Sequence, residues 1–185
     1  MFGGCQEKMV RFLIILICLV FSSWAQASDM REALEQSGAN VVFMRHALAP
    51  GYGDPDNFKV GDCSTQRNLN DAGRRQAAAI GREFRNNNIV FDRILSSQWC
   101  RCQETAHYLG IGAWAEFTGL NSFFQGYADK QQTVQFLEEK LSTIPLDHLV
   151  LMVTHQVVIS EITGYAPASG GLIFYNTQSK KAGEW

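Results

Sequence analysis

Two short runs of consecutive apolar residues stand out along the chain. They are Val41–Met44 and Leu149–Val153, and each is bounded by polar residues. Continuous apolar runs of about four to eight residues are typical of strands buried on both faces, as in a parallel sheet. The first run is followed by the dipeptide Arg45-His46 and the second by Thr154-His155. Both predicted strands are therefore followed by a histidine, a side chain that can act as a nucleophile or as an acid or base.

The segments around these runs carry apolar residues at helical spacing. The clearest is Leu69–Asn86, which has one apolar face. Asn70 is a suitable N-cap for it, because its side chain can accept a hydrogen bond from a free amide of the first turn. Further helices are expected over Ser28–Gly38, Trp99–Leu109, Lys130–Leu141 and Gln156–Ile162, and further strands over Phe91–Leu95, Ala113–Phe117 and Leu172–Tyr175.

Strands that alternate with helices predict an α/β fold. We expect a three-layer α/β/α sandwich with a mostly parallel central sheet, formed by residues 28–185 as a single domain. The polar tail after Asn176 is expected to be exposed.

Two irregular segments interrupt this alternation, residues 47–67 and 120–129. The first follows the Arg45-His46 dipeptide directly, and long irregular loops in compact domains are usually functional, so we expect it to form the rim of a site. It contains three aspartates, which lack the spacing of a calcium-binding loop and are interpreted as solvated loop residues. They are Asp54, Asp56 and Asp62.

The first 27 residues have the organisation of a secretory signal peptide. Lys8 and Arg11 precede the apolar stretch Phe12–Phe21, and Ala25-Gln26-Ala27 is a small-x-small cleavage site. Ten apolar residues are too few to span a bilayer, so we expect an exported protein, periplasmic or secreted, with no membrane anchor after cleavage. The formal charge of −2 gives no basic surplus that would indicate a nucleic-acid partner, and a monomer is the default expectation.

Three cysteines, Cys63, Cys100 and Cys102, follow the predicted signal peptide. Export places them in an oxidising compartment, where an odd number allows at most one intramolecular bridge and leaves one free thiol. Cys100 and Cys102 are two apart on a predicted helix and point away from each other. Cys63 can therefore pair with Cys100 or with Cys102, and Cys63–Cys100 is our working assignment.

The polar residues at the strand ends suggest one pocket. If both buried strands are central and parallel, His46 and His155 project at the same edge of the sheet. Another predicted strand ends at Ser96-Ser97, and Arg101 lies in the helix that follows, whose N-terminal amides we expect to face the same space. With Arg45, these groups suit a tetrahedral dianion. A neutral imidazole can attack phosphorus, arginines can bind the equatorial oxygens, and no metal or cofactor is required.

Four pieces of sequence in this order resemble the motifs of the histidine phosphatase superfamily. They are Arg45-His46-Ala47, Leu69–Ala77, Ser96–Ala106 and Thr154-His155. The family patterns are Arg-His-Gly, Leu-Thr-x-x-Gly-x-x-Gln-Ala, Ser-Ser-x-x-x-Arg-x-x-x-Thr-Ala and a strand that ends in His. The resemblance covers about Val41 to Gly164 and implies a phosphoglycerate-mutase-like fold.

Carried over to this chain, the resemblance implies that His46 is the nucleophile. Arg45, Arg101 and His155 would form the rest of the phosphate pocket, and Arg67 is a further candidate for substrate binding, with a surface role at the helix start as its alternative. Ala47 replaces the usual glycine of the family.

The proton donor is the larger departure from the family pattern. Where the family often has Leu-x-Glu, this chain has Leu120-Asn121-Ser122. Glu116 is the nearest preceding carboxylate and is the candidate donor. Some members of the family manage without a donor and act on phosphoramidates or on good leaving groups.

We therefore expect a metal-independent phosphatase that hydrolyses a phosphomonoester or phosphoramidate through a phosphohistidine on His46. Its partner would be a small phosphorylated substrate or a phosphoprotein. The alternative is a binding module of the same fold that recognises a phosphate ligand without turnover, which the missing carboxylate suggests. A phosphomutase is disfavoured, because exported compartments are poor in phosphorylated primers.

Overall fold

The computed structural model describes residues 30–185, so the predicted signal peptide and the first two residues of the first predicted helix lie outside the described residues. The helices of the described part are α2 (Met30–Ser37), α3 (Asp71–Asn86), α4 (Cys100–Leu109), α5 (Lys130–Ser142) and α6 (Gln156–Thr163). The strands are β1 (Val41–Arg45), β2 (Arg93–Ser96), β3 (Ala115–Glu116), β4 (Val150–Thr154), β5 (Leu172–Tyr175) and β6 (Ala182–Glu184).

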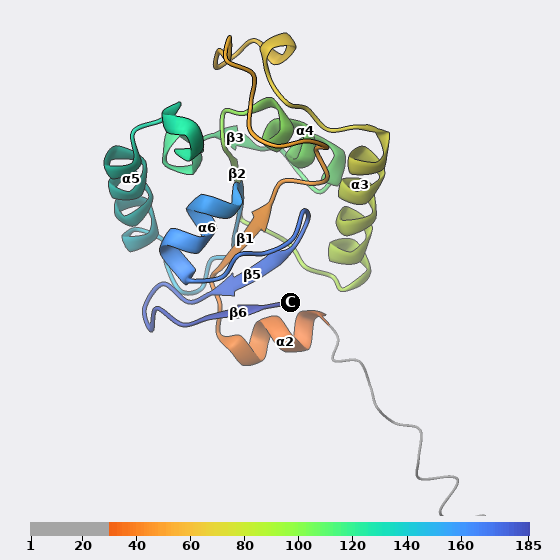
Figure 1. The fold of residues 1–185 in the computed structure, drawn as a ribbon. Coiled ribbons are helices and arrows are strands. Elements are labelled where there is room, and N and C mark those ends of the chain that lie inside the picture. Colours follow the sequence, from red (N-terminus) through yellow and green to blue (C-terminus); the bar gives the residue numbers. More distant parts are fainter. Residues whose placement is uncertain (1–29) are drawn as a thin grey trace, which may run out of the picture.

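The strands form one mixed sheet in the order β3-β2-β4-β1-β5-β6. The first four strands of this order are mutually parallel, whereas β5 and β6 run antiparallel to their neighbours. Both apolar runs, now β1 and β4, lie at the centre of this order and pair with each other. Figure 1 shows β1 in the interior of the sheet, with helices around it. The predicted fold class, with a mostly parallel central sheet, is confirmed.

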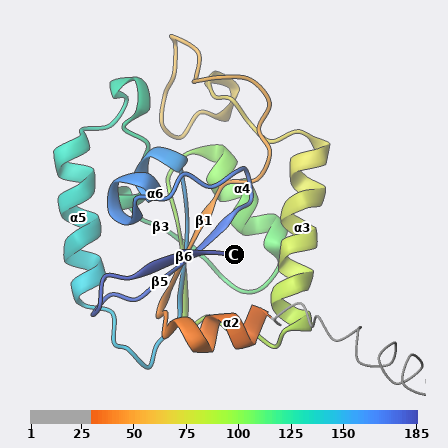
Figure 2. The same cartoon turned by 60° about the horizontal axis from the view of Figure 1, so that its bottom comes forward.

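Helices cover both faces of this sheet and complete three layers. Figure 2 shows α2, α3 and α4 on one side of the strands and α5 and α6 on the other. Alternate residues of β1 point to opposite faces of the sheet. Val42 and Met44 pack with α2, α3 and α4, whereas Val41 and Phe43 pack with α5 and α6. All four of these side chains are fully buried, which is why the strand reads as a continuous apolar run.

Local capping sets the helix ends that the sequence predicts. The side chain of Asn70 accepts a hydrogen bond from the amide of Gly73 at 2.9 Å and starts α3. Gly110 and Gly164 end α4 and α6 in the left-handed conformation that glycine adopts readily. The predicted helices therefore agree with the observed ones to within two residues where both ends are described.

The edges of the sheet differ from the prediction. The strand expected over Ala113–Phe117 shortens to two paired residues, and part of the tail after Asn176 forms β6 instead of remaining fully exposed. The ring of Trp185 stacks on Phe174 with centroids 6.0 Å apart, so the end of the chain packs on β5. The polar composition of the tail does not reveal this pairing.

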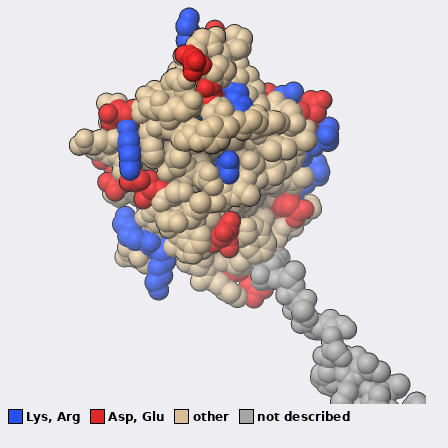
Figure 3. Space-filling view, in the orientation of Figure 1, with Lys and Arg blue, Asp and Glu red and all other residues tan. Residues whose placement is uncertain are grey.

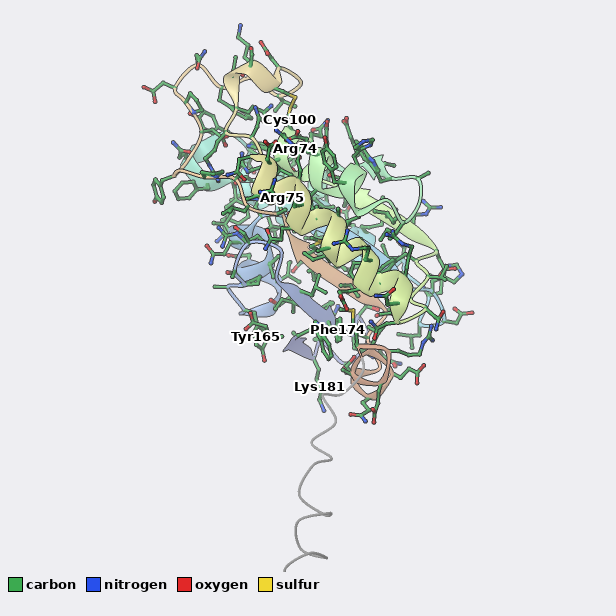
Figure 4. All side chains as sticks on the ribbon, turned by 90° about the vertical axis from the view of Figure 1, so that its right-hand side faces the viewer. Arg74, Arg75, Cys100, Tyr165, Phe174 and Lys181 are labelled. Atoms are coloured by element: carbon green, nitrogen blue, oxygen red, sulfur yellow. A yellow bond between two sulfur atoms is a disulfide. The ribbon has the colours of Figure 1, made fainter. Side chains whose placement is uncertain are left out.

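The irregular segment 47–67 projects from the carboxyl end of the parallel strands. A disulfide joins Cys63 in this segment to Cys100 at the start of α4, across a separation of 37 residues (Figure 4). Cys102 is free and buried. The Cys63–Cys100 assignment therefore agrees with the structure, and the Cys63–Cys102 alternative does not.

Charged side chains of both signs are interspersed on the face drawn in Figure 3. No helix within residues 30–185 combines the length and apolar character needed to cross a membrane.

Candidate active site

The register of the central strands brings the two predicted site histidines together. Arg45 pairs with Thr154 across β1 and β4, so the residues that follow them, His46 and His155, lie side by side. The backbone amide of His46 extends the ladder with a 2.9 Å hydrogen bond to the carbonyl of Thr154. The two imidazole rings lie 5.5 Å apart, centroid to centroid. The sheet itself therefore fixes the position of both histidines.

A pocket of about 240 Å³ opens at this edge of the sheet. We call Arg45, His46, Arg101 and His155 the pocket floor, and segments 47–67 and 121–129 the pocket rim. The rim lines the pocket through Gly51, Tyr52, Gly53, Arg67, Ser122 and Phe124. A larger hollow of about 420 Å³ lies near the other ends of β2 and β4 and holds none of the motif residues.

His46 is prepared to act as a nucleophile. Its side chain is 3% exposed, and its Nδ1 lies 2.8 Å from the carbonyl oxygen of Ala47. A carbonyl only accepts, so the proton of the neutral ring lies on Nδ1 and leaves a lone pair on Nε2. Burial, and then the positive charge of Arg101, hold the pKa of His46 well below its ordinary value of 6.5. The imidazole is therefore neutral at physiological pH.

The two floor arginines present buried donors that have no partner in the described chain. The Nε atoms of Arg45 and Arg101 are both buried without a hydrogen bond. The other nitrogens of Arg45 are partly engaged, since its NH1 donates to the carbonyl of Pro167 at 2.9 Å. Buried donors are rarely left unpaired, because each lost hydrogen bond costs about 1–3 kcal/mol. An anion that accepts from both arginines would remove this cost.

Asp54 is buried beside Arg101, and its interpretation as a solvated loop residue is wrong. Its carboxylate accepts hydrogen bonds from Arg101 NH1 at 2.7 Å, from the amide of Arg67 at 3.0 Å and from the indole of Trp99 at 3.0 Å. Burial opposes ionisation of this carboxyl, but the bond and charge of Arg101 outweigh it and lower the pKa of Asp54. The sequence offered one clue: a buried arginine needs a counter-charge.

The other two loop aspartates fit the interpretation given to them. Asp56 is exposed, and the exposed Asp62 caps the short helical turn Cys63–Thr65 by accepting from the amide of Ser64 at 3.1 Å.

His155 is held by a chain of hydrogen bonds that runs away from the pocket. Arg101 NH2 lies 3.4 Å from His155 Nδ1, and because a guanidinium only donates, the proton of the ring lies on Nε2. That Nε2–H lies 3.0 Å from the hydroxyl oxygen of Ser97, which in turn donates to Asn121 Oδ1 at 3.2 Å. Burial, and then the charge of Arg101, place the pKa of His155 well below 6.5. Sequence reasoning found Ser97 but missed Asn121.

Arg67 is half-buried in the wall of the same pocket. Its Nε donates to the carbonyl of Gly53 at 2.8 Å, and its NH1 donates to the carbonyl of Ala49. Arg67 thus lines the pocket and also holds the turn of the rim that contains Tyr52. The pocket alternative, rather than a surface role, matches this position.

Glu116, the candidate proton donor, is not brought to the pocket. It lies in β3 with an exposed side chain, and its carboxylate accepts from the side-chain amides of Gln98 at 3.2 Å and Gln103 at 2.9 Å. Among the described residues that line the pocket, none is a carboxylic acid. The proton-donor assignment therefore lacks geometric support.

The helix N-terminus makes a smaller contribution than expected. The amide of Cys100 donates to Gln66 Oε1 at 2.9 Å, and the amides of Trp99 and Gln98 donate to Ser97 and Asn121. These three amides donate to side chains of Gln66, Ser97 and Asn121, so the expectation that they face the anion space is wrong for them.

Cys102 packs between the strands and the pocket floor. Burial raises the pKa of its thiol to about 12, so the group stays protonated. Within residues 30–185, no three His, Cys, Asp or Glu side chains are grouped so as to hold a metal ion.

Comparisons with known proteins agree with this geometry. Residues 38–120 match the sequence profile described as the histidine phosphatase superfamily (branch 1). The mitochondrial serine/threonine-protein phosphatase Pgam5 of Drosophila virilis is 30% identical over 79 residues, which cover 43% of this chain and 25% of that protein. The chain thus spans only about a quarter of the length of this relative.

Solved structures share the fold at low sequence identity. The mycobacterial glucosyl-3-phosphoglycerate phosphatase complexed with VO3 superposes with a TM-score of 0.54 at 16% identity, covering 80% of this chain and 97% of that one. The protein histidine phosphatase SixA complexed with tungstate gives a TM-score of 0.52 at 14% identity, covering 78% and 93%. Residues 38–120, which carry β1 and the Arg101 motif, are thus similar to the histidine phosphatase superfamily, and the solved structures show that the chain shares the fold of these phosphatases.

Proposed function

We propose that this protein is a phosphatase that hydrolyses a phosphomonoester or a phosphoramidate through a phosphohistidine on His46. The observation that carries the proposal is the arrangement of the pocket floor. A neutral imidazole with a free Nε2 lies in the same pocket as two buried arginines whose Nε donors lack partners. This combination of a nucleophile and unpaired cationic donors suits a tetrahedral dianion.

In the first step, Nε2 of His46 attacks phosphorus in line with the leaving group. The new Nε2–P bond forms as the bond to the leaving oxygen or nitrogen breaks, and the leaving group departs with the bonding electron pair. Arg45 and Arg101 donate to the equatorial oxygens, where charge is concentrated in the transition state. The Nδ1–H bond to the carbonyl of Ala47 stabilises the positive charge that His46 acquires.

In the second step, water attacks the phosphohistidine and releases inorganic phosphate, with Nε2 taking back its electron pair. His155 assists in both steps. A bound dianion counters the positive field of the arginines, so we expect Nδ1 of His155 to take up a proton and donate to a phosphoryl oxygen. The Ser97–Asn121 pair keeps Nε2–H engaged and the ring oriented during this change.

The origin of the leaving-group proton limits the substrates. General acid catalysis typically contributes about 10²–10⁴ in rate, and no carboxylic acid lines the pocket among the described residues. Turnover is therefore expected to favour leaving groups that depart without a strong acid. A relative named a phosphatase and matched at 30% identity over 79 residues supports the same class of reaction.

We further propose that the protein is exported, to the periplasm or outside the cell. The organisation of residues 1–27 supports a cleaved signal peptide, and the Cys63–Cys100 disulfide is typical of an oxidising compartment. The mass of the protein purified from its native host tests this. Cleavage after Ala27 gives residues 28–185, whereas retention of residues 1–27 in the cytosolic fraction contradicts it.

The missing carboxylate also supports a second candidate, a module that binds a phosphate ligand without turnover. The unpaired Nε donors of Arg45 and Arg101 can bind a phosphate group whether or not the phosphoryl group is then transferred. The two candidates differ in whether His46 forms a covalent bond to phosphorus.

Hydrolysis of para-nitrophenyl phosphate in excess chelator tests the proposal. An aryl phosphate has a good leaving group, so a missing acid does not mask activity. We expect wild type to turn over, His46→Ala to lose turnover, and His107→Ala, which changes an exposed histidine of α4, to match wild type. Radiolabel from a phosphate donor should remain on wild type after acid-free denaturation and be absent from His46→Ala.

Two results would overturn the phosphatase proposal. Turnover by His46→Ala at the wild-type rate excludes the phosphohistidine. No turnover by wild type, with vanadate still raising the melting temperature, favours the binding module.

A further inference from the structure

Two aromatic rings stand at the mouth of the pocket. Tyr52 is 88% exposed, and Phe124 is partly buried beside it. Their ring centroids are 5.2 Å apart and their planes are nearly perpendicular, at 86°. Both line the pocket that contains His46. Two rings at right angles form a corner that can hold a third ring, stacked on one and edge-on to the other.

The rim positions this corner through its backbone. Tyr52 lies between Gly51 and Gly53, whose φ values of +99° and +66° are ones that side chains disfavour. Gln125, next to Phe124, is itself left-handed at φ +63°, and its Oε1 accepts a 2.8 Å hydrogen bond from the amide of Asp54. This bond links the two rim segments and so holds the backbone that carries the two rings.

In-line attack directs the leaving group toward this corner. His46 is 3% exposed at the floor, whereas Tyr52 is 88% exposed at the mouth. A leaving group opposite Nε2 of His46 must therefore extend from phosphorus toward the mouth. Whatever carries the phosphoryl group meets the rim rings.

Polar side chains of the mouth offer little to a sugar or another hydroxyl-rich group. The amide of Gln156 donates to the carbonyl of Ala166 at 3.1 Å, and the hydroxyl of Ser122 accepts from the amide of Phe124 at 3.3 Å. The amide of Gln125 is used by Asp54. These polar groups are therefore already engaged, whereas the rings of Tyr52 and Phe124 are available to a ligand at the mouth.

We propose that the substrate carries its phosphoryl group directly on an aromatic ring, and that Tyr52 and Phe124 bind that ring. This inference rests on the proposed phosphatase function. A phenolate delocalises the electron pair that it receives when its bond to phosphorus breaks, and solvent water protonates it afterwards. A phosphorylated imidazole that carries a proton on its other nitrogen leaves as the neutral ring. Such a leaving group needs no strong acid in the pocket, which matches the lining. A phosphotyrosyl side chain and a phosphohistidyl side chain share this chemistry.

Binding of phosphonates isolates ring recognition from leaving-group chemistry, because the carbon–phosphorus bond is not hydrolysed. We expect phenylphosphonate to inhibit wild type about three- to tenfold more tightly than propylphosphonate, the range that one aromatic contact typically supplies. Tyr52→Ala and Phe124→Leu should each remove most of this ratio, because they weaken phenylphosphonate more than propylphosphonate. Tyr108→Ala, at an exposed tyrosine near the far end of α4, is the control and should keep the ratio.

Turnover of the phosphorylated amino acids identifies the source of the ring. We expect kcat/KM for phosphotyrosine or phosphohistidine, or for both, to exceed that for phosphoserine. Tyr52→Ala should lower kcat/KM of the ring substrates three- to tenfold through KM, a larger loss than the one it causes for phosphoserine. The substrate with the higher kcat/KM then identifies which phosphorylated side chain, tyrosyl or histidyl, the pocket accepts. Because Tyr52 is exposed, its replacement leaves the packed core intact.

The failure of this inference is distinguishable from that of the proposed function. If wild type hydrolyses para-nitrophenyl phosphate but the phosphonate ratio is one, or is unchanged in Tyr52→Ala, ring recognition is wrong and the phosphatase stands. If His46→Ala retains turnover, the proposed function is wrong and the inference that rests on it is withdrawn.

Discussion

The pocket floor and the pocket rim are held by different means. The floor is an extension of the parallel ladder: β1, β4 and β2 end in register, and backbone hydrogen bonds place His46 beside Thr154 and Ser97 beside Val153. The rim is irregular chain, secured by one disulfide, one buried ion pair and bonds from side chains to the backbone. The sheet thus fixes Arg45 and the two histidines, while Arg101 of α4 and the surface that meets the leaving group depend on a few cross-links.

Removing Asp54 should have the largest effect on stability, because this carboxylate belongs to the rim but pairs with Arg101 of the floor. Both partners of the ion pair are 4% exposed. We expect Asp54→Ala to lower the free energy of unfolding by about 3–5 kcal/mol, the usual cost of leaving a buried charge unpaired. Denaturant unfolding measures this. Asp56→Ala, an exposed neighbour in the same segment, is the control and should change stability by less than about 0.5 kcal/mol. Equal stability of the two variants would contradict the role assigned to Asp54.

The difference between floor and rim also explains what the sequence could predict. Arg45, His46 and His155 follow apolar runs whose pattern predicts central parallel strands, so their meeting point follows from topology. Asp54 and Asn121 lie in segments without periodicity, and only long-range packing brings them to Arg101 and Ser97. No local pattern encodes such contacts.

The chemical type of a residue is also insufficient to predict whether it reaches the pocket, as Glu116 and the amides at the start of α4 show. Glu116 precedes the loop where the family pattern predicts a carboxylate, but β3 places it against Gln98 and Gln103. The amides at the start of α4 were assigned to an anion, but Gln66 of the rim takes the amide of Cys100. In both cases a competing hydrogen-bond partner, distant in the sequence, decides the outcome.

Opening the disulfide tests how far the rim depends on its cross-links. We expect the double change Cys63→Ser and Cys100→Ser to lower the free energy of unfolding by about 3–4 kcal/mol, the chain-entropy value for a closed loop of this length. A reductant should lower the stability of wild type by a similar amount and leave the double variant unchanged. If wild type with and without reductant unfolds at the same denaturant concentration, the rim does not depend on this bond.

The floor histidines and Asp54 of the rim should lose their contributions to the free energy of unfolding at different pH values. Both floor histidines have a lowered pKa in the folded state, so between that pKa and about 6.5 the unfolded chain binds more protons, and stability falls as pH falls. Each contributes up to about 1.4 kcal/mol per pH unit in that window. Asp54, whose pKa is also lowered, contributes stability that is lost only as pH falls below about 3.9.

Unfolding free energies measured from pH 7 to pH 3 check this order. His155→Asn should remove part of the loss just below pH 6.5, and Asp54→Asn should remove part of the loss at lower pH. A stability that stays constant from pH 7 to pH 4 would contradict the buried neutral histidines.

The smallest effect is expected at the turn that carries Tyr52, and a matched pair of glycines isolates it. Gly53 and Gly61 have φ values of +66° and +85°, so alanine is strained at both positions, at a cost of about 1–2 kcal/mol. A Cβ at Gly61 would meet nothing within 4 Å, whereas a Cβ at Gly53 would lie 2.5 Å from Gln125 Oε1. Gly53→Ala must therefore push the amide of Gln125 away from Asp54 and cost about 1 kcal/mol more than Gly61→Ala. Because that hydrogen bond joins the two rim segments, Gly53→Ala should also weaken the preference for phenylphosphonate, and Gly61→Ala should preserve it. Equal stability and equal preference in the two variants would show that the rim rings are placed without the bond between Gln125 and Asp54.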